Sequence, residues 1–196
     1  SSKTKKSLVL TLSEKNLSQL INKQDTFFKN SQNSPKFSEK EMTRQAQEIV
    51  AAYEDHLSKN PEDVHGLILF GKFLNRVGQK THATEYFMKA DMLNPKIAVV
   101  KQQLANYLVE QGRPVDAFPY FILTIELNPK EAVYHYHLGN FLFIFQKELS
   151  DAGILNKSSV LSFMHRSFKE STNLNPNHFD FYLRYAQSFF DFPDSD

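Results

Sequence analysis

An asparagine–proline pair recurs along the sequence and sets its period. The four pairs are Asn60-Pro61, Asn94-Pro95, Asn128-Pro129 and Asn175-Pro176, and a leucine precedes the last three of them. The first three prolines stand 34 residues apart, and the fourth follows after 47 residues. A fixed period in this range is typical of helical pairs stacked in an array. The period therefore indicates an all-α chain whose class of function is a binding surface.

Each Asn-Pro pair is expected to end one helix and to begin the next. Asparagine tolerates the left-handed conformation that commonly follows a helix, whereas proline can start a helix but cannot continue one. The residue before a proline is also displaced from the α region. Gly78 and Gly112 each divide a period into two stretches of helical spacing, so each period contains two helices. Pro119 falls inside one such stretch, and we expect it in the first turn, where its missing N–H has no partner to lose.

The first 35 residues are polar and rich in lysine, serine, asparagine and glutamine. Leu12, Leu17, Leu20, Ile21 and Phe28 nevertheless have rough helical spacing. This segment is therefore either a linker or a short docking helix. We divide the chain into a polar N-terminal extension, residues 1–35, and a helical domain, residues 36–196.

The domain is expected to open with a helix at 37–58. Ser38 can cap the first turn of this helix, and the Glu41 side chain can reach back to the backbone at the start of the helix. Phe37 can pack on Met42 as a hydrophobic staple. A single apolar stripe along the following residues indicates a helix with one buried face.

The periodic residues resemble those of the tetratricopeptide repeat (TPR) family. A TPR unit has 34 residues, with a large residue, Leu-Gly and an aromatic on its first helix and Ala, an aromatic and Ala on its second. The matching units are 64–97, 98–131 and 132–178, and a half-unit follows at 179–192. The resemblance implies an all-α, right-handed superhelical solenoid of antiparallel helix pairs, and it covers most of the chain. The matching residues are Leu67, Phe70-Gly71, Leu74, Ala83, Phe87, Ala90 and Pro95, then Leu104-Ala105, Leu108, Ala117, Phe121, Thr124 and Pro129, then His135, Leu138-Gly139, Leu142, Phe168, Ser171 and Pro176, and finally Tyr182, Tyr185-Ala186 and Phe189.

The third unit is lengthened, because its prolines are 47 rather than 34 residues apart. We place the insertion near 146–158. It is expected to lengthen the helix that begins at Ala132 and to add a loop before the next helix. Met164 stands where the family has alanine, so the second helix of this unit departs from the family's packing.

In TPR proteins the first helices of successive units line a concave groove that binds peptides or partner segments, and the resemblance implies the same here. Lys72, Asn106, Asn140 and Gln187 occupy the same slot in successive units. Side-chain amides both donate and accept hydrogen bonds, so such a row can hold a peptide backbone without reading its sequence. We therefore expect a protein–protein interaction scaffold. The expected groove residues are Lys72, Arg76, Gln102, Gln103, Asn106, Tyr136, His137, Asn140, Phe143, Arg184 and Gln187.

Some TPR domains bind a C-terminal carboxylate with a clamp of cations and asparagine. The nearest equivalent set here is Gln102, Asn106, His137 and Arg184, and Asp180 stands where a cation is required. An acid at that position repels a carboxylate, so we do not expect a carboxylate clamp.

The crowded aromatic residues near the C-terminus form a second candidate surface. Repeat arrays need a polar terminal cap for solubility, and none is evident in the sequence. The alternative function is therefore a structural or oligomerisation segment of a longer repeat protein. Either the natural chain continues with further units, which we favour, or this end self-associates. An end-on interface would use Phe181, Tyr185, Phe189 and Phe190.

Composition and motifs argue against several other classes of function. A net charge of +1 gives no reason to expect a nucleic-acid partner, and no apolar run is long enough to span a membrane. His135 and His137 are two residues apart and lie on different faces of a helix, so we expect no metal site and no cofactor. The sequence contains no Gly-rich phosphate loop and no nucleophile elbow, so we do not expect an enzyme.

The chain has no cysteine, which leaves its compartment open. The cytoplasm is slightly favoured, and an exported bacterial location stays an alternative.

Overall fold

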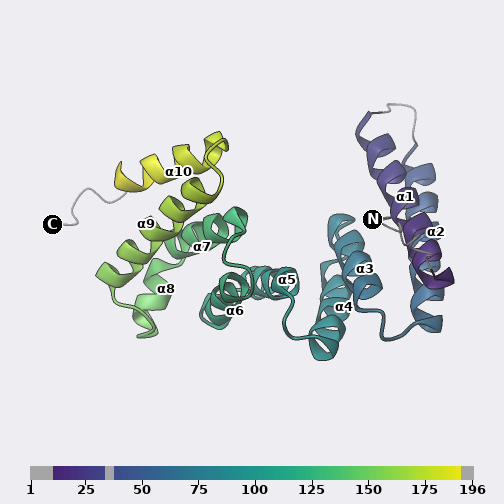
Figure 1. Cartoon of the computed structure of the whole chain (residues 1–196), viewed down its shortest axis with the longest axis horizontal. Coiled ribbons are helices and arrows are strands. Elements are labelled where there is room, and N and C mark those ends of the chain that lie inside the picture. Colours follow the sequence, from purple (N-terminus) through teal and green to yellow (C-terminus); the bar gives the residue numbers. More distant parts are fainter. Residues whose placement is uncertain (1–10, 34–37, 191–196) are drawn as a thin grey trace, which may run out of the picture. The chain divides into compact units, whose positions relative to one another are not determined.

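The computed structural model describes residues 11–33 and 38–190, and all regular structure in these ranges is helical (Figure 1). The chain divides into two compact units, Ser1–Leu93 and Asn94–Asp196. No helix in the described ranges combines the length and hydropathy of a membrane span. The first unit contains α1 (Leu12–Asn33), α2 (Glu39–Lys59), α3 (Val64–Arg76) and α4 (Lys80–Leu93), and the second contains α5 (Ala98–Glu110), α6 (Pro114–Leu127), α7 (Ala132–Ile144), α8 (Gln146–Asp151), α9 (Lys157–Leu174) and α10 (Phe179–Phe190).

Helix α1 contributes apolar side chains to the core of the first unit. It packs along α2 and also contacts α3. Leu17, Leu20, Phe27 and Phe28 are all buried. The ring centroid of Phe73 on α3 lies 6.0 Å from that of Phe27 and 5.6 Å from that of Phe28. The segment that we expected as a polar extension thus supplies a helix that pairs with α2.

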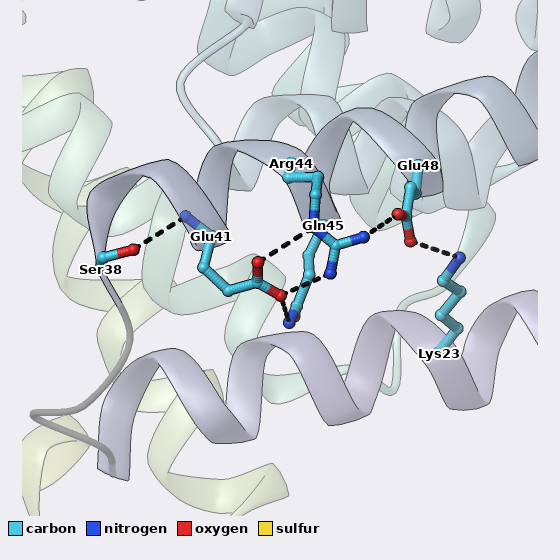
Figure 2. A network of polar contacts seen from close by, with 6 residues as sticks. All are labelled: Lys23, Ser38, Glu41, Arg44, Gln45 and Glu48. Carbon is cyan, nitrogen blue, oxygen red and sulfur yellow. Dashed lines mark hydrogen bonds and ion pairs between the residues drawn. The ribbon is translucent and has the colours of Figure 1, made fainter.

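The start of α2 is capped as the sequence predicts (Figure 2). The Ser38 hydroxyl accepts a hydrogen bond of 3.2 Å from the Glu41 backbone N–H. The Glu41 side chain does not reach back to the backbone at the start of α2. It accepts instead from Arg44, at 2.6 and 3.0 Å. The expected staple depends on Phe37, which lies outside the described residues.

Polar side chains also connect α2 to α1 (Figure 2). Arg44 is paired with Glu48, and the Glu48 carboxylate lies 3.4 Å from the Lys23 Nζ of α1. These groups are exposed, so water and salt screen each pair and it contributes little to stability. A more protected link is the Tyr53 hydroxyl, which donates to Gln24 at 2.9 Å from a fully buried ring.

The Asn-Pro pairs do end helices, but their asparagines are not left-handed. Asn60, Asn128 and Asn175 have φ values of −135°, −144° and −137°. The following proline displaces each residue from the α region, while its backbone N–H still donates to a carbonyl four residues earlier. Among the described residues, positive φ values occur only at glycines, namely Gly78, Gly112 and Gly153. The helices therefore end through the constraint from proline rather than through asparagine's tolerance of left-handed backbone.

The insertion forms a helix of its own rather than lengthening the preceding one. α7 ends at Ile144, and α8 begins at Gln146. Leu149 of α8 is fully buried in the same core cluster as Phe141 and Met164. Gly153, with φ of 69°, then reverses the chain before α9. The methionine that departs from the family pattern is also fully buried, so it fills space in this core.

Pro119 lies in the second turn of α6 rather than in its first. The helix begins at Pro114, which places Pro119 inside it. Its missing N–H deprives the carbonyl four residues earlier of its usual intrahelical donor. Pro119 is on the exposed side of the helix, where water can supply that hydrogen bond.

Two glycines allow the helices of a pair to approach closely. A Cβ built on Gly71 would lie 2.8 Å from the ring of Phe87, and one built on Gly139 would lie 2.5 Å from the ring of Phe168. Both phenylalanines are buried, at 2% and 0% exposed. Each ring therefore occupies the space that a side chain on the facing helix would need.

We expect Gly139→Ala to lower the free energy of unfolding by about 1–3 kcal/mol, because the added methyl group overpacks the buried ring of Phe168. Denaturant unfolding followed by circular dichroism measures this loss. Phe168→Leu removes the ring and provides the control, since the glycine substitution should cost much less in that background. An equal cost in both backgrounds would contradict this account of the contact.

Candidate peptide-binding surface

The expected groove residues of the first unit, Lys72 and Arg76, lie on α3. Lys72 is exposed. The guanidinium carbon of Arg76 lies 3.6 Å from the ring centroid of Phe28 on α1, a cation–π contact. Arg76 therefore already packs on a helix that the sequence did not place there. The remaining expected residues belong to the second unit and form two separate clusters.

The first cluster is a pair of amides on α5. The Gln102 Nε2 donates to the Asn106 Oδ1 at 3.0 Å. Gln102 is only 3% exposed, and its Oε1 is buried without a hydrogen-bond partner among the described residues. A buried acceptor without a partner costs about 1–3 kcal/mol. The pair therefore leaves a buried acceptor on Gln102, and Asn106 has further donors on its half-buried amide. Gln103, beside this pair, is half-buried.

The second cluster joins α7 to α10 around Arg184. The Arg184 Nε donates to the Asn140 Oδ1 at 3.2 Å, across 44 residues of sequence. The guanidinium carbon lies 4.1 Å from the ring centroid of Phe143 and 4.9 Å from that of Phe168. Arg184 is thus held in place by two rings and an amide rather than extended into solvent. Gln187, one turn further along α10, is exposed.

Near the second cluster, Tyr136 and His137 line a hollow of about 300 Å³ where the starts of α7 and α10 meet. The Tyr136 ring lies 4.8 Å from that of Phe181, centroid to centroid. Two exposed acids, Glu131 and Asp180, also line the hollow. Neither acid forms an ion pair within the described residues. An apolar floor with acidic edges suits a ligand that is apolar or positively charged and disfavours a carboxylate.

Sequence reasoning missed most of this hollow. Glu131 and His178 come from the residues that precede α7 and α10, where no family position draws attention to them, and Asp180 was singled out only as an obstacle to a carboxylate. The Asn-Pro pair before each helix could have pointed to these residues, because residues that follow such a break lie near the start of the next helix.

The expected end-on interface is only partly exposed. Phe181 is 5% exposed because it packs on Tyr136, so it cannot contact another molecule, and Tyr185 is half-buried. Phe189 and Phe190 are 52% and 82% exposed. Exposed apolar residues that the sequence did not assign to this interface are Phe179, Tyr182 and Leu183.

Burial lowers the pKa of His137 below its ordinary value of 6.5, and its Nδ1 is buried without a hydrogen-bond partner among the described residues. The unfolded chain binds a proton near pH 6.5, whereas the folded chain does so only at lower pH. Stability should therefore fall as the pH drops below 6.5. Burial lowers the pKa of His165 in the same direction.

We expect His137→Gln to reduce this acid sensitivity without abolishing it. Urea midpoints at pH 7.5 and pH 5.5 measure the effect. The difference between the two midpoints should be smaller in the variant than in the unmodified chain. The variant lacks one of the two histidines whose pKa burial lowers. An unchanged difference would contradict the buried, neutral state of His137.

Similarity to proteins of known structure identifies the fold. No protein-family model matches the sequence, and no curated protein matches it. MamA 41-end from Desulfovibrio magneticus RS-1 has 16% identity and a TM-score of 0.61, over 88% of this chain and 87% of that one. YrrB, described as a TPR protein with an unusual peptide-binding site, has 16% identity and a TM-score of 0.58, over 95% and 86%.

The first TPR of Spaghetti (RPAP3), solved bound to an HSP90 peptide, has 16% identity and a TM-score of 0.55, over 66% of this chain and 93% of that one. These identities are low, so the similarity concerns the arrangement of the helices. The helical pairs, their period and these neighbours agree. The chain has the tetratricopeptide repeat fold.

Proposed function

We propose that the second unit is a protein-interaction module that binds an extended peptide segment along α5, α7 and α10. The observation that carries this proposal is the half-buried Asn106 amide, whose Oδ1 accepts from Gln102 at 3.0 Å, so that its N–H groups remain to donate to a ligand. A peptide group offers one N–H and one C=O. Its C=O can therefore accept from the Asn106 amide.

Hydrogen bonds of this kind hold the peptide backbone without selecting its side chains. Asn140 provides a second such group, since its Oδ1 accepts from Arg184 and its amide nitrogen donates to no described residue. The stacked guanidinium orients this amide, so less conformational entropy is lost when a ligand binds.

Selectivity would come from the hollow beside Tyr136. Its apolar wall includes Val133 and Phe181, and its acids are Glu131 and Asp180. An apolar or basic side chain of the ligand fits this lining, whereas a terminal carboxylate does not. The solved TPR neighbours support the class of function, because two of them are described by a bound peptide or a peptide-binding site.

A non-catalytic role is part of the proposal. The groups that the proposal places on this surface are amides, an arginine, aromatic rings, His137 and two exposed acids, and none of them is a serine, threonine or lysine nucleophile beside a base. A serine–histidine pair does occur elsewhere, where the His165 Nδ1 lies 2.9 Å from the Ser188 hydroxyl. Ser188 is fully buried, and its hydroxyl donates to the Tyr185 carbonyl at 2.6 Å, so a substrate cannot reach it.

The test is the combined substitution of Asn106→Ala and Asn140→Ala. Peptides are first selected from a random display library on the immobilised full chain, and their affinities are then measured by fluorescence polarisation. Each lost amide contact is worth about 0.5–1.5 kcal/mol, so the double variant should bind about tenfold more weakly or worse.

Asn173→Ala is the matched control, because Asn173 is an exposed asparagine on α9, the second helix of its repeat unit, and lies outside the proposed surface. It should bind the selected peptides as the unmodified chain does. Equal affinity of the double variant, or a library from which no peptide is enriched, would refute the proposal.

A further inference from the structure

The outward face of α10 is apolar along its whole length. Its residues follow the spacing i, i+3, i+4, i+7 and i+11, which places them on one side of a helix. Four of the side chains are large and between 44% and 82% exposed, and no charged residue interrupts them. We name this face the α10 stripe; its members are Phe179, Tyr182, Leu183, Ala186 and Phe190.

The complete pairs of the fold show what such a face normally contacts. The eighth residue of each first helix is small, namely Gly71 in α3, Ala105 in α5 and Gly139 in α7, and all three are buried. At the two glycines, a phenylalanine of the second helix fills the adjacent space. The eighth residue of α10 is Ala186, and it is exposed. The α10 stripe therefore carries the small residue on which an antiparallel helix packs elsewhere in the fold. No described helix packs on it.

We propose that a second copy of this chain covers the α10 stripe, with the two α10 helices antiparallel across a two-fold axis. An axis between residues 184 and 185 places Leu183 opposite Ala186 of the second copy. It also places Phe179 opposite Phe190 of the second copy. Each contact occurs twice, because a two-fold interface uses the same patch on both chains.

The stripe is self-complementary in size as well as in position. A large residue meets a small one at its centre, and aromatic residues meet at its two ends. This is the combination that lets two helices approach closely. The charged residues of α10 do not oppose the contact. Asp180 lies to the side of the stripe, and the Arg184 guanidinium lies over Phe143 and Phe168 inside the unit.

The overall charge also permits association. A net charge of +1 gives almost no long-range repulsion between copies. One helical face on each chain buries less than the roughly 1,600 Å² of a standard interface, so the dimer should be weak. We expect a dissociation constant on the order of 10–100 μM.

Sedimentation equilibrium of the full chain over a range up to about 300 μM tests the proposal. The mass should rise toward that of a dimer. Leu183→Glu should keep the chain monomeric throughout this range, because it places two carboxylates in an apolar contact. Met92→Glu is the matched control, since Met92 is 85% exposed on α4 and its substitution should leave the dimer unchanged. Circular dichroism confirms that each variant is folded.

An exchange of the two central residues tests the register. Leu183→Ala and Ala186→Leu should each weaken the dimer at least about fivefold, the first by leaving a cavity and the second by overpacking. The double variant restores a large residue opposite a small one and should recover most of the affinity. A monomeric unmodified chain at the highest concentration, a dimer that Leu183→Glu leaves intact, or a double variant as weak as the sum of its parts would overturn the proposal.

Discussion

Contact between a small residue on one helix and an aromatic ring on the next determines how closely the helices of a pair can pack. At Gly71 and Gly139 the ring lies where a methyl group would otherwise be, so the backbones approach to within the thickness of a side chain. The remaining core residues then fill space that this spacing defines, including the unusual Met164 and the inserted Leu149. Interiors packed to this density tolerate few changes of volume, so the glycine and the ring depend on one another.

The pairs in the repeating part of the chain could be predicted because proline and glycine act locally. A proline excludes the α region for its predecessor whatever surrounds it, and this is why the helix ends near residues 60, 94, 128 and 175 follow from sequence alone. The conformation of the asparagines could not be predicted in the same way. Asparagine can adopt a left-handed conformation but does not have to. The following proline determines the conformation that these asparagines adopt.

Elements that depend on distant partners were harder to predict. Helix α1 buries few of its 22 residues, so its apolar stripe is weak and its polar composition resembles that of a linker. Its buried rings contact Phe73, which lies far along the sequence. The site shows the same division. The repeat places Asn140 at an exposed slot, but its pairing with Arg184 bridges 44 residues and depends on the rings beneath the guanidinium. The sequence specifies the slots of the surface, whereas tertiary packing decides which of them are already occupied.

The burial of Phe73 beneath α1 bears on where this protein can be cut. A boundary at residue 36, which composition alone recommends, would remove the ring contacts that Phe27 and Phe28 make with Phe73 and the cation–π partner of Arg76. The shortened fragment would expose an apolar patch where α1 covers the unit, and such a patch favours aggregation. Fragments meant to retain the first unit's native surface should therefore begin before Leu12.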